Sequence, residues 1–180
     1  MKIINLVIIT LLLINLQACS EDSPAPKANA ENDQQASVSN NKILYPDGEI
    51  KDAVLGELKH GRWELVMFWA TYCSICKKDF EKLAKFIDDN PEISLTIVGV
   101  VVDGIEEKDK AITQIHQRYL DYAHVITDFD QGNKLYQEIT DTPLLGVPSQ
   151  LLYNTQNELV GFSRHAIDTD ALELMVYDES

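Results

Sequence analysis

Positive charge is scarce in this chain of 180 residues, which has 15 lysine and arginine residues against 29 aspartate and glutamate residues. Because binding to a phosphate backbone needs clustered basic charge, this balance argues against nucleic acid as a partner. The sequence also contains no internal repeat. Apolar residues make up 45% of the chain, which is enough for a hydrophobic core, and the length suits about one domain.

A hydrophobic run long enough to cross a membrane is also missing. The apolar stretch at residues 3–16 has the length of a signal-peptide core, but asparagine and threonine interrupt it and a span needs about 20 apolar residues. It ends in LQAC, residues 16–19, which resembles the bacterial lipoprotein box, where a peptidase cuts before the cysteine and that cysteine carries lipid. We therefore expect residues 1–18 to be a lipoprotein signal peptide and Cys19 to be lipidated. An ordinary cleaved signal and an uncleaved anchor are the alternatives.

Residues 20–41 lack aromatic side chains and contain a single β-branched residue. Such a segment cannot bury enough apolar surface to offset its ordering entropy, so we expect a flexible tether. The predicted organisation is a signal peptide (1–18), a lipidated cysteine with its tether (19–42) and a folded domain (43–180). Ser20 follows the cysteine in place of aspartate, and by resemblance to Gram-negative sorting signals this favours the outer membrane. The expected location is the bacterial cell envelope, facing the periplasm.

Cysteine is rare, with three residues in all, and an exported chain with three cysteines leaves one unpaired. If Cys19 is acylated, Cys73 and Cys76 remain as a pair in the segment CSIC. Two thiols at this spacing can be half of a metal clip, a structural disulfide or a reversible redox pair.

The rest of the chain alternates between apolar runs and amphipathic stretches. The Pro-Asp-Gly turn within residues 43–50 predicts a small hairpin at the start of the domain. Apolar runs predict buried strands, and apolar residues at helical spacing predict helices. The strands are expected at 63–70, 93–103 and 124–127, with two more within 141–162 that are joined at 154–157. The helices are expected at 74–89, 106–121, 130–140 and 168–177. This order predicts an α/β sandwich with a mixed sheet flanked by helices.

Two segments carry a resemblance to a known family. The first is FWATYCSICKKDF at residues 68–80, and the second is GVPSQLLYNTQNELVGF at residues 146–162. Together they resemble the membrane-tethered extracytoplasmic thiol–disulfide oxidoreductases of the TlpA/ResA type. The resemblance implies a thioredoxin fold over residues 43–178, with the predicted hairpin as an N-terminal extension. It also implies a cis proline at Pro148 that faces the cysteines, and it implies no cofactor beyond the redox-active disulfide.

The positions of the cysteines agree with such chemistry. A side chain in the first turn of a helix lies where unpaired N–H groups and the helix dipole favour negative charge. Cys73 is therefore expected to hold the thiolate that attacks disulfides, and Cys76, one turn further in, to resolve the mixed disulfide. Backbone groups of Val147, just before the proline, are expected to bind an extended client. Trp69 and Tyr72 are expected to shield the pair and to shape the docking surface.

The chain departs from the family pattern in ways that bear on the mechanism. Met67 stands where thioredoxin has a buried aspartate, so the base that deprotonates Cys76 must lie elsewhere. Asp79 is the candidate, because it follows Cys76 by three residues on the same helix face, where ResA-like proteins have glutamate. Glu64 is a second candidate. The dipeptide between the cysteines lacks proline, which should move the reduction potential, and Glu81 replaces a proline, which predicts a less kinked helix.

Other uses of the pair are disfavoured. A zinc clip normally needs four ligands, and the sequence has neither a second CxxC nor a suitably spaced pair of histidines, so we expect no metal site. Cu(I) delivery would suit two thiolates and a histidine, but the copper-binding branch of this fold usually has three residues between its cysteines, and His165 is poorly placed as the distant ligand. A permanent disulfide would close too small a loop to stabilise the fold much.

The sequence therefore favours a membrane-tethered enzyme that reduces disulfides of client proteins, for example during cytochrome c maturation. A membrane electron donor would re-reduce the pair, and the direction of reduction comes from the resemblance. A Cu(I)-binding module on the same fold and a redox-inert interaction lipoprotein remain as alternatives.

Overall fold

The computed structural model describes residues 42–117 and 122–178. The predicted signal peptide, Cys19 and most of the predicted tether lie outside these ranges. Among the helices that the two ranges contain, none combines the length and the apolar character that a membrane span requires.

The strands of the described ranges form one mixed sheet with the order β1-β4-β3-β2-β5-β6. Strands β1 to β4 run parallel, β5 is antiparallel to β2, and β6 is antiparallel to β5. The strands are β1 (Ile43–Leu44), β2 (Trp63–Trp69), β3 (Leu95–Val101), β4 (Ala123–Ile126), β5 (Ser149–Tyr153) and β6 (Leu159–Ser163). Every residue of β2 is buried, because neighbouring strands pair with both of its edges and helices cover both of its faces.

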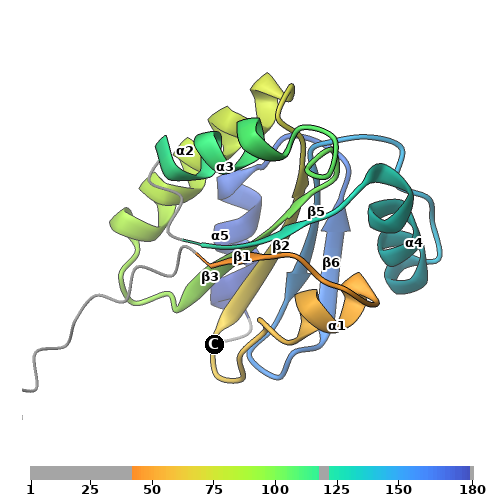
Figure 1. Ribbon diagram of the computed structural model, residues 1–180. Coiled ribbons are helices and arrows are strands. Elements are labelled where there is room, and N and C mark those ends of the chain that lie inside the picture. Colours follow the sequence, from red (N-terminus) through yellow and green to blue (C-terminus); the bar gives the residue numbers. More distant parts are fainter. Residues whose placement is uncertain (1–41, 118–121, 179–180) are drawn as a thin grey trace, which may run out of the picture. The chain divides into compact units, whose positions relative to one another are not determined.

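Helices cover the two faces of the sheet in different sets (Figure 1). The helices are α1 (Ile50–Leu55), α2 (Ser74–Asp89), α3 (Lys108–Gln117), α4 (Phe129–Thr140) and α5 (Thr169–Asp178). Right-handed crossovers from β2 to β3 and from β3 to β4 place α2 and α3 on one face, and α5 contacts α2 there. Helices α1 and α4 contact each other on the opposite face.

Side chains of β2 show this division directly, because successive residues of a strand point to opposite faces. Trp69 packs edge-on against Phe80 of α2, with ring centroids 5.7 Å apart. Its neighbour Phe68 packs edge-on against Tyr136 of α4 at 5.4 Å. The face covered by α2, α3 and α5 is called the α2 face below, and the other is called the α4 face.

The predicted mixed α/β architecture is confirmed, with strands and helices close to their expected ranges, but the N-terminal hairpin is wrong. Residues 43 and 44 pair in parallel with β4, and the chain after the Pro-Asp-Gly turn enters helix α1. The turn residues suggested two strand arms. Ile50 and Val54, four residues apart, instead form one buried helical stripe.

Candidate functional site

The two cysteines lie where β2 ends and α2 begins. Cys73 is the N-cap of α2, and its Sγ accepts a hydrogen bond from the backbone N–H of Cys76 at 3.1 Å. The Cys73 N–H donates to the carbonyl of Ala70 at 3.0 Å, which closes the turn. A sulfur in this position meets unpaired N–H groups and the positive end of the helix dipole, which favour a thiolate.

The cysteines form a disulfide in this structure, with their Cα atoms 5.4 Å apart. They differ in accessibility, since Cys73 is 7% exposed and Cys76 is 0% exposed. An incoming disulfide could therefore approach the sulfur of Cys73, whereas the sulfur of Cys76 can react only with Cys73. The attacking role of Cys73 and the resolving role of Cys76 stay predictions.

A carboxylate from the next strand fixes the turn before the cysteines. Asp103, just after β3, accepts hydrogen bonds from the backbone N–H of Thr71 at 3.0 Å and from its hydroxyl at 2.7 Å. Gln114 of α3 donates to the carbonyl of Thr71 at 3.1 Å. Both polar groups of the Thr71 backbone are thus held, two residues before Cys73. Asp103 was not among the predicted site residues, although an acid at the end of a buried apolar strand is a usable signal in the sequence.

The predicted cis proline lies beside this turn. The Val147–Pro148 peptide bond is cis, and Pro148 is buried directly before β5. Phe68 pairs with Ser149 in the antiparallel ladder, so the next position of the register brings Pro148 opposite Trp69, at the end of β2. Because proline has no N–H, it cannot extend the ladder there. Val147 is half-buried and immediately precedes it.

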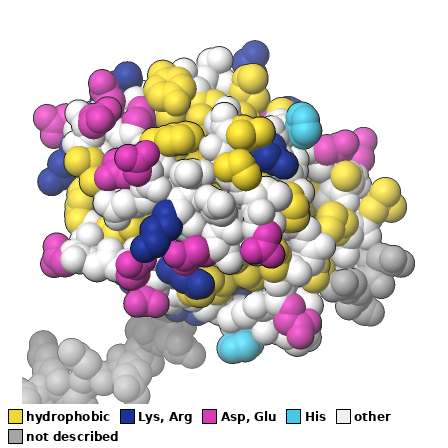
Figure 2. Space-filling model, turned by 90° about the vertical axis from the view of Figure 1, so that its right-hand side faces the viewer, with side chains coloured by type: hydrophobic (Ala, Val, Ile, Leu, Met, Phe, Trp, Pro, Cys, Tyr) yellow, Lys and Arg dark blue, Asp and Glu magenta, His cyan; other side chains and the backbone are white. Residues whose placement is uncertain are grey.

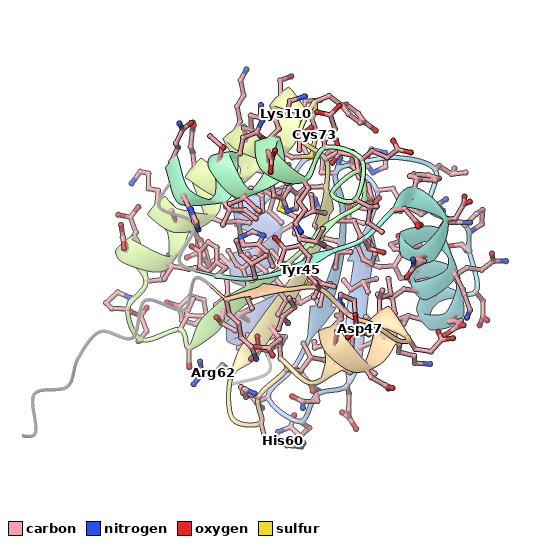
Figure 3. All side chains as sticks on the ribbon, viewed as in Figure 1. Tyr45, Asp47, His60, Arg62, Cys73 and Lys110 are labelled. Carbon is pink, nitrogen blue, oxygen red and sulfur yellow. A yellow bond between two sulfur atoms is a disulfide. The ribbon has the colours of Figure 1, made fainter. Side chains whose placement is uncertain are left out.

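Large apolar side chains are exposed at this same edge of the sheet, where parallel strands end. They come from the cysteine turn, the loop after β3 and the loop before Pro148, and they are Tyr72 (69% exposed), Ile75 (51%), Ile105 (54%) and Leu145 (75%). Figure 2 shows hydrophobic side chains reaching the surface along its upper edge, the end of the molecule at which Figure 3 labels Cys73. Trp69 is not among them. It is 1% exposed and packs against Phe80 and His124, so the expectation that it shapes the docking surface is corrected.

Asp79 is a buried carboxyl one helical turn after Cys76. Its Oδ2 accepts a hydrogen bond from the Ile167 N–H at 3.2 Å, and Lys82 Nζ lies 3.7 Å from Oδ1. Burial raises the pKa of Asp79 above its ordinary value, and the hydrogen bond from Ile167 and the charge of Lys82 offset part of that rise. The structure thus places a carboxyl with raised proton affinity on the helix face that carries Cys76.

Glu64, the second candidate base, lies elsewhere. It is buried near the start of β2, nine residues before Cys73, and it shares the strand face of Phe68, which is the α4 face. Arg62, two residues before Glu64, lies at the end of the molecule opposite Cys73 (Figure 3). Burial raises the pKa of Glu64 to about 7, although the Lys59 N–H donates to its Oε1 at 3.0 Å. Glu64 therefore lies at the opposite end of β2 from the cysteines and on the opposite face of the sheet. This position excludes it as the base for Cys76.

His124 of β4 is a buried titratable residue that was not among the predicted site residues. Its ring lies on the α2 face among Trp69 and Phe80, and burial lowers its pKa to about 3, so the ring is neutral. Gly99 makes room for it, since a Cβ there would lie 2.1 Å from Nδ1. A glycine inside the β-branched run of β3 was the signal for this close approach.

The described residues contain no group of three or more His, Cys, Asp or Glu side chains that could hold a metal ion.

The fold and the cysteine pair define the class of protein: a thioredoxin-fold protein with a Cys-x-x-Cys disulfide where its central strand meets a helix. Comparison with known protein families gives a more specific assignment. Residues 23–140 match the sequence profile of the AhpC/TSA family, which is more than half of the chain. The chain therefore belongs to the AhpC/TSA family.

Solved structures agree on the fold. A thiol:disulfide interchange protein of the thioredoxin family from Chlorobium tepidum TLS is 16% identical, with a TM-score of 0.54 over 66% of this chain and 79% of that one. A thiol-disulfide oxidoreductase from Bacteroides fragilis is 18% identical, with a TM-score of 0.52 over 67% of this chain and 83% of that one. A search of curated proteins finds no match.

Proposed function

We propose that this protein is a membrane-tethered, extracytoplasmic oxidoreductase of the TlpA/ResA type that reduces disulfides in client proteins. The observation that carries the proposal is the asymmetry of the cysteine pair. Cys73 is the N-cap of α2, at the end of β2 where Pro148 lies opposite Trp69, and 7% of its surface is exposed, whereas Cys76 is 0% exposed. A structural disulfide would need no such difference between its two sulfurs.

The reaction proceeds by two thiol–disulfide exchanges. The Cys73 thiolate attacks one sulfur of a client disulfide, a mixed disulfide forms, and the other client sulfur leaves as a thiolate that takes a proton from water. The Cys76 sulfur then attacks Cys73 Sγ, and the second client sulfur leaves as a thiolate that also takes a proton from water. The client has gained two electrons and two protons, and the enzyme is left with the Cys73–Cys76 disulfide seen here.

Three further residues take part in these two exchange reactions. Asp79, one turn from Cys76, takes the proton of the Cys76 thiol before the second exchange. Val147 offers backbone groups to an extended client segment, and the exposed ring of Tyr72 contacts its side chains. The pair needs no cofactor beyond its own disulfide, and a membrane electron donor restores the two thiols.

The tether and location rest on the sequence. The LQAC segment, the apolar core before it and the low-complexity stretch after it support a lipid on Cys19 and a flexible link to a domain beginning near residue 43. The proposed site is the periplasmic side of the cell envelope, with Ser20 favouring the outer membrane. In a fractionation test, Cys19→Ala should move the protein out of the membrane fraction. An unchanged membrane fraction would rule out acylation as the anchor.

The direction of electron flow follows from the resemblance to tethered reductases, and thiols of apocytochrome c before haem attachment are an example of the client class. A reductase should be held mostly in its dithiol form in cells. Alkylation trapping of the pair in growing cells measures this, and a mostly oxidised pair would instead indicate an oxidase.

A trapping experiment tests the assignment of roles. Cys76→Ser should accumulate mixed disulfides with client proteins through Cys73, because the exchange stops after its first step. Cys73→Ser is the matched control and should trap none. If Cys76→Ser accumulates no adduct, or if Cys73→Ser accumulates as many, the proposed roles are wrong.

A further inference from the structure

Among the buried acceptor oxygens of the described residues, two on the α2 face have no donor within 3.5 Å, although Lys82 Nζ lies 3.7 Å from one of them. Oδ1 of Asp79 and Oε1 of Gln150 are both shielded from solvent, and neither has a hydrogen-bond partner within the described residues. Buried polar atoms are nearly always paired, because an unpaired one costs about 1–3 kcal/mol, so two such atoms call for an explanation.

Both side chains are anchored to the same short segment between β6 and α5. Asp79 Oδ2 accepts from the backbone N–H of Ile167 at 3.2 Å, and Gln150 Nε2 donates to the carbonyl of His165 at 3.0 Å. The carbonyl of His165 can only accept, so it fixes which end of the Gln150 amide is nitrogen. The oxygen of that amide is therefore the end without a donor.

Gln150 occupies the strand row that lies beneath α2. It pairs with Met67 of β2, and Met67 shares the face of Trp69, which packs on α2. Gln150 is 3% exposed, and the side chain of Asp79 is 1% exposed and comes down from α2 above this row. A carboxyl from the helix and an amide from the sheet thus approach a common backbone segment from two elements.

The charged and titratable groups around Asp79 are few. Lys82 of α2 lies 3.7 Å from Oδ1, is about half exposed and also donates to the Ile167 carbonyl at 3.4 Å. His165 and Asp168 lie in the segment that holds Asp79, and both are exposed. Gln150, on β5, is uncharged. Burial outweighs Lys82 and the Ile167 N–H in setting the direction of the pKa of Asp79, which is raised.

We propose that Gln150 is a positioning residue whose Oε1 accepts the proton of Asp79, so that a neutral acid–amide pair lies one turn below Cys76 whenever the cysteines are joined. One proton satisfies both orphaned oxygens at once, since a protonated carboxyl is a donor and an ionised one is not. This inference deepens the proposed function and rests on it for its role in the reaction.

The proton has a defined origin and destination. In the second exchange the Cys76 thiol transfers its proton to the Asp79 carboxylate, the Cys76 sulfur forms a bond to Cys73 Sγ, and the bond from Cys73 to the client sulfur breaks. The client sulfur leaves with the electron pair of that bond. Gln150 stabilises the protonated product on Asp79, and Lys82 stabilises the carboxylate that exists before transfer. Re-reduction returns the proton to Cys76.

The test is a carboxyl ¹³C NMR titration of Asp79 in the oxidised full-length protein, with Gln150→Met as the variant and Gln137→Met, on the exposed side of α4, as the control. Wild type should hold the Asp79 proton above the ordinary pKa of aspartate. Gln150→Met should lower the proton affinity of Asp79 about tenfold, because the protonated form loses one hydrogen bond. Gln137→Met should not change it.

Two outcomes would overturn the pairing. In wild type alone, Asp79 titrating at or below its ordinary pKa would show that no proton is held there, whether or not the variant folds. An unchanged titration in a folded Gln150→Met protein would show that the amide plays no part. Neither result depends on disulfide exchange, so trapping by Cys76→Ser can succeed while the pairing fails, and the reverse.

Discussion

Among residues 42–117 and 122–178, each face of the central sheet buries one carboxyl side chain, and the two differ in their surroundings. On the α2 face, Asp79 lies one helical turn from Cys76 with Lys82 beside it. On the α4 face, Glu64 lies near the far end of β2, and within the described part of the chain its one hydrogen-bond donor is the N–H of Lys59. Burial is the largest cause of the raised pKa in both. A raised pKa therefore indicates that a carboxyl is buried. Only a carboxyl that also lies close to the cysteines can take part in disulfide exchange.

The largest expected effect is a difference in activity between substitutions of the two carboxyls. Asp79→Asn removes the proton acceptor next to Cys76 and should slow release of client from the mixed disulfide by about 100-fold, the usual range for loss of a general base. Glu64→Gln should leave that rate within about twofold, since it lies too far away to exchange a proton with Cys76. Stopped-flow measurement of client thiol release compares them. Asp88→Asn, on the exposed side of α2, controls for the loss of a negative charge on that helix. A slower rate for Glu64→Gln than for Asp79→Asn would reverse the comparison.

Stability should also distinguish the two carboxyls, and here the substitution of Glu64 should have the clear effect. The pKa of Glu64 is about 7 in the folded protein against 4.5 ordinarily, so folding favours its protonated form. Stability therefore falls as the pH rises from about 4.5, and above about 7 the full penalty of about 3 kcal/mol is present. Glu64→Gln carries no charge to bury, and its side-chain oxygen can still accept from Lys59. Urea unfolding should show a gain of about 3 kcal/mol at pH 8.5 and almost none near pH 4.5. A gain that is the same at both pH values would contradict the buried-charge explanation.

The α2 face also holds His124, whose packing can be tested through Gly99. A Cβ at Gly99 would lie 2.1 Å from the ring of His124, so Gly99→Ala must displace that ring. We expect a loss of about 2–3 kcal/mol in the free energy of unfolding from overpacking. Gly48→Ala is the matched control, since a Cβ there meets nothing within 4 Å, and it should change stability by less than about 0.5 kcal/mol. Equal effects of the two substitutions would mean that the ring can move freely.

The smallest effect should come from the anchor of the cysteine turn. Asp103→Asn leaves one side-chain oxygen to serve both the N–H and the hydroxyl of Thr71 and should cost about 1–2 kcal/mol of unfolding free energy. Thr71→Val removes one of the same hydrogen bonds. The double variant should therefore lose less than the sum of the two single losses. Strictly additive losses in thermal or urea unfolding would show that these contacts do not act as a unit.

Local patterns in the sequence were sufficient for much of this fold. The apolar run at 63–70 and the helical spacing over 74–89 predicted elements that the structure contains, and the cis bond before Pro148 agrees with what the family resemblance of the Gly-Val-Pro segment implied. The cysteines were placed correctly at the junction of β2 and α2, because the change from strand to helix periodicity falls at Cys73. These features depend on residues close together in the chain.

What the sequence determined by itself was most of the elements, their order and the place of the cysteine pair where a strand meets a helix. The tertiary structure alone decided that residues 50–55 form a helix instead of a hairpin arm, that Trp69 is sealed in the core, and that Glu64 and Asp79 face opposite sides of the sheet. It also brought Gln150 and Asp79, 71 positions apart in the sequence, to the same backbone segment. Alternation along a strand fixes which residues share a face. Which face meets which helix depends on strand pairing and crossover between distant segments, and no local pattern encodes those.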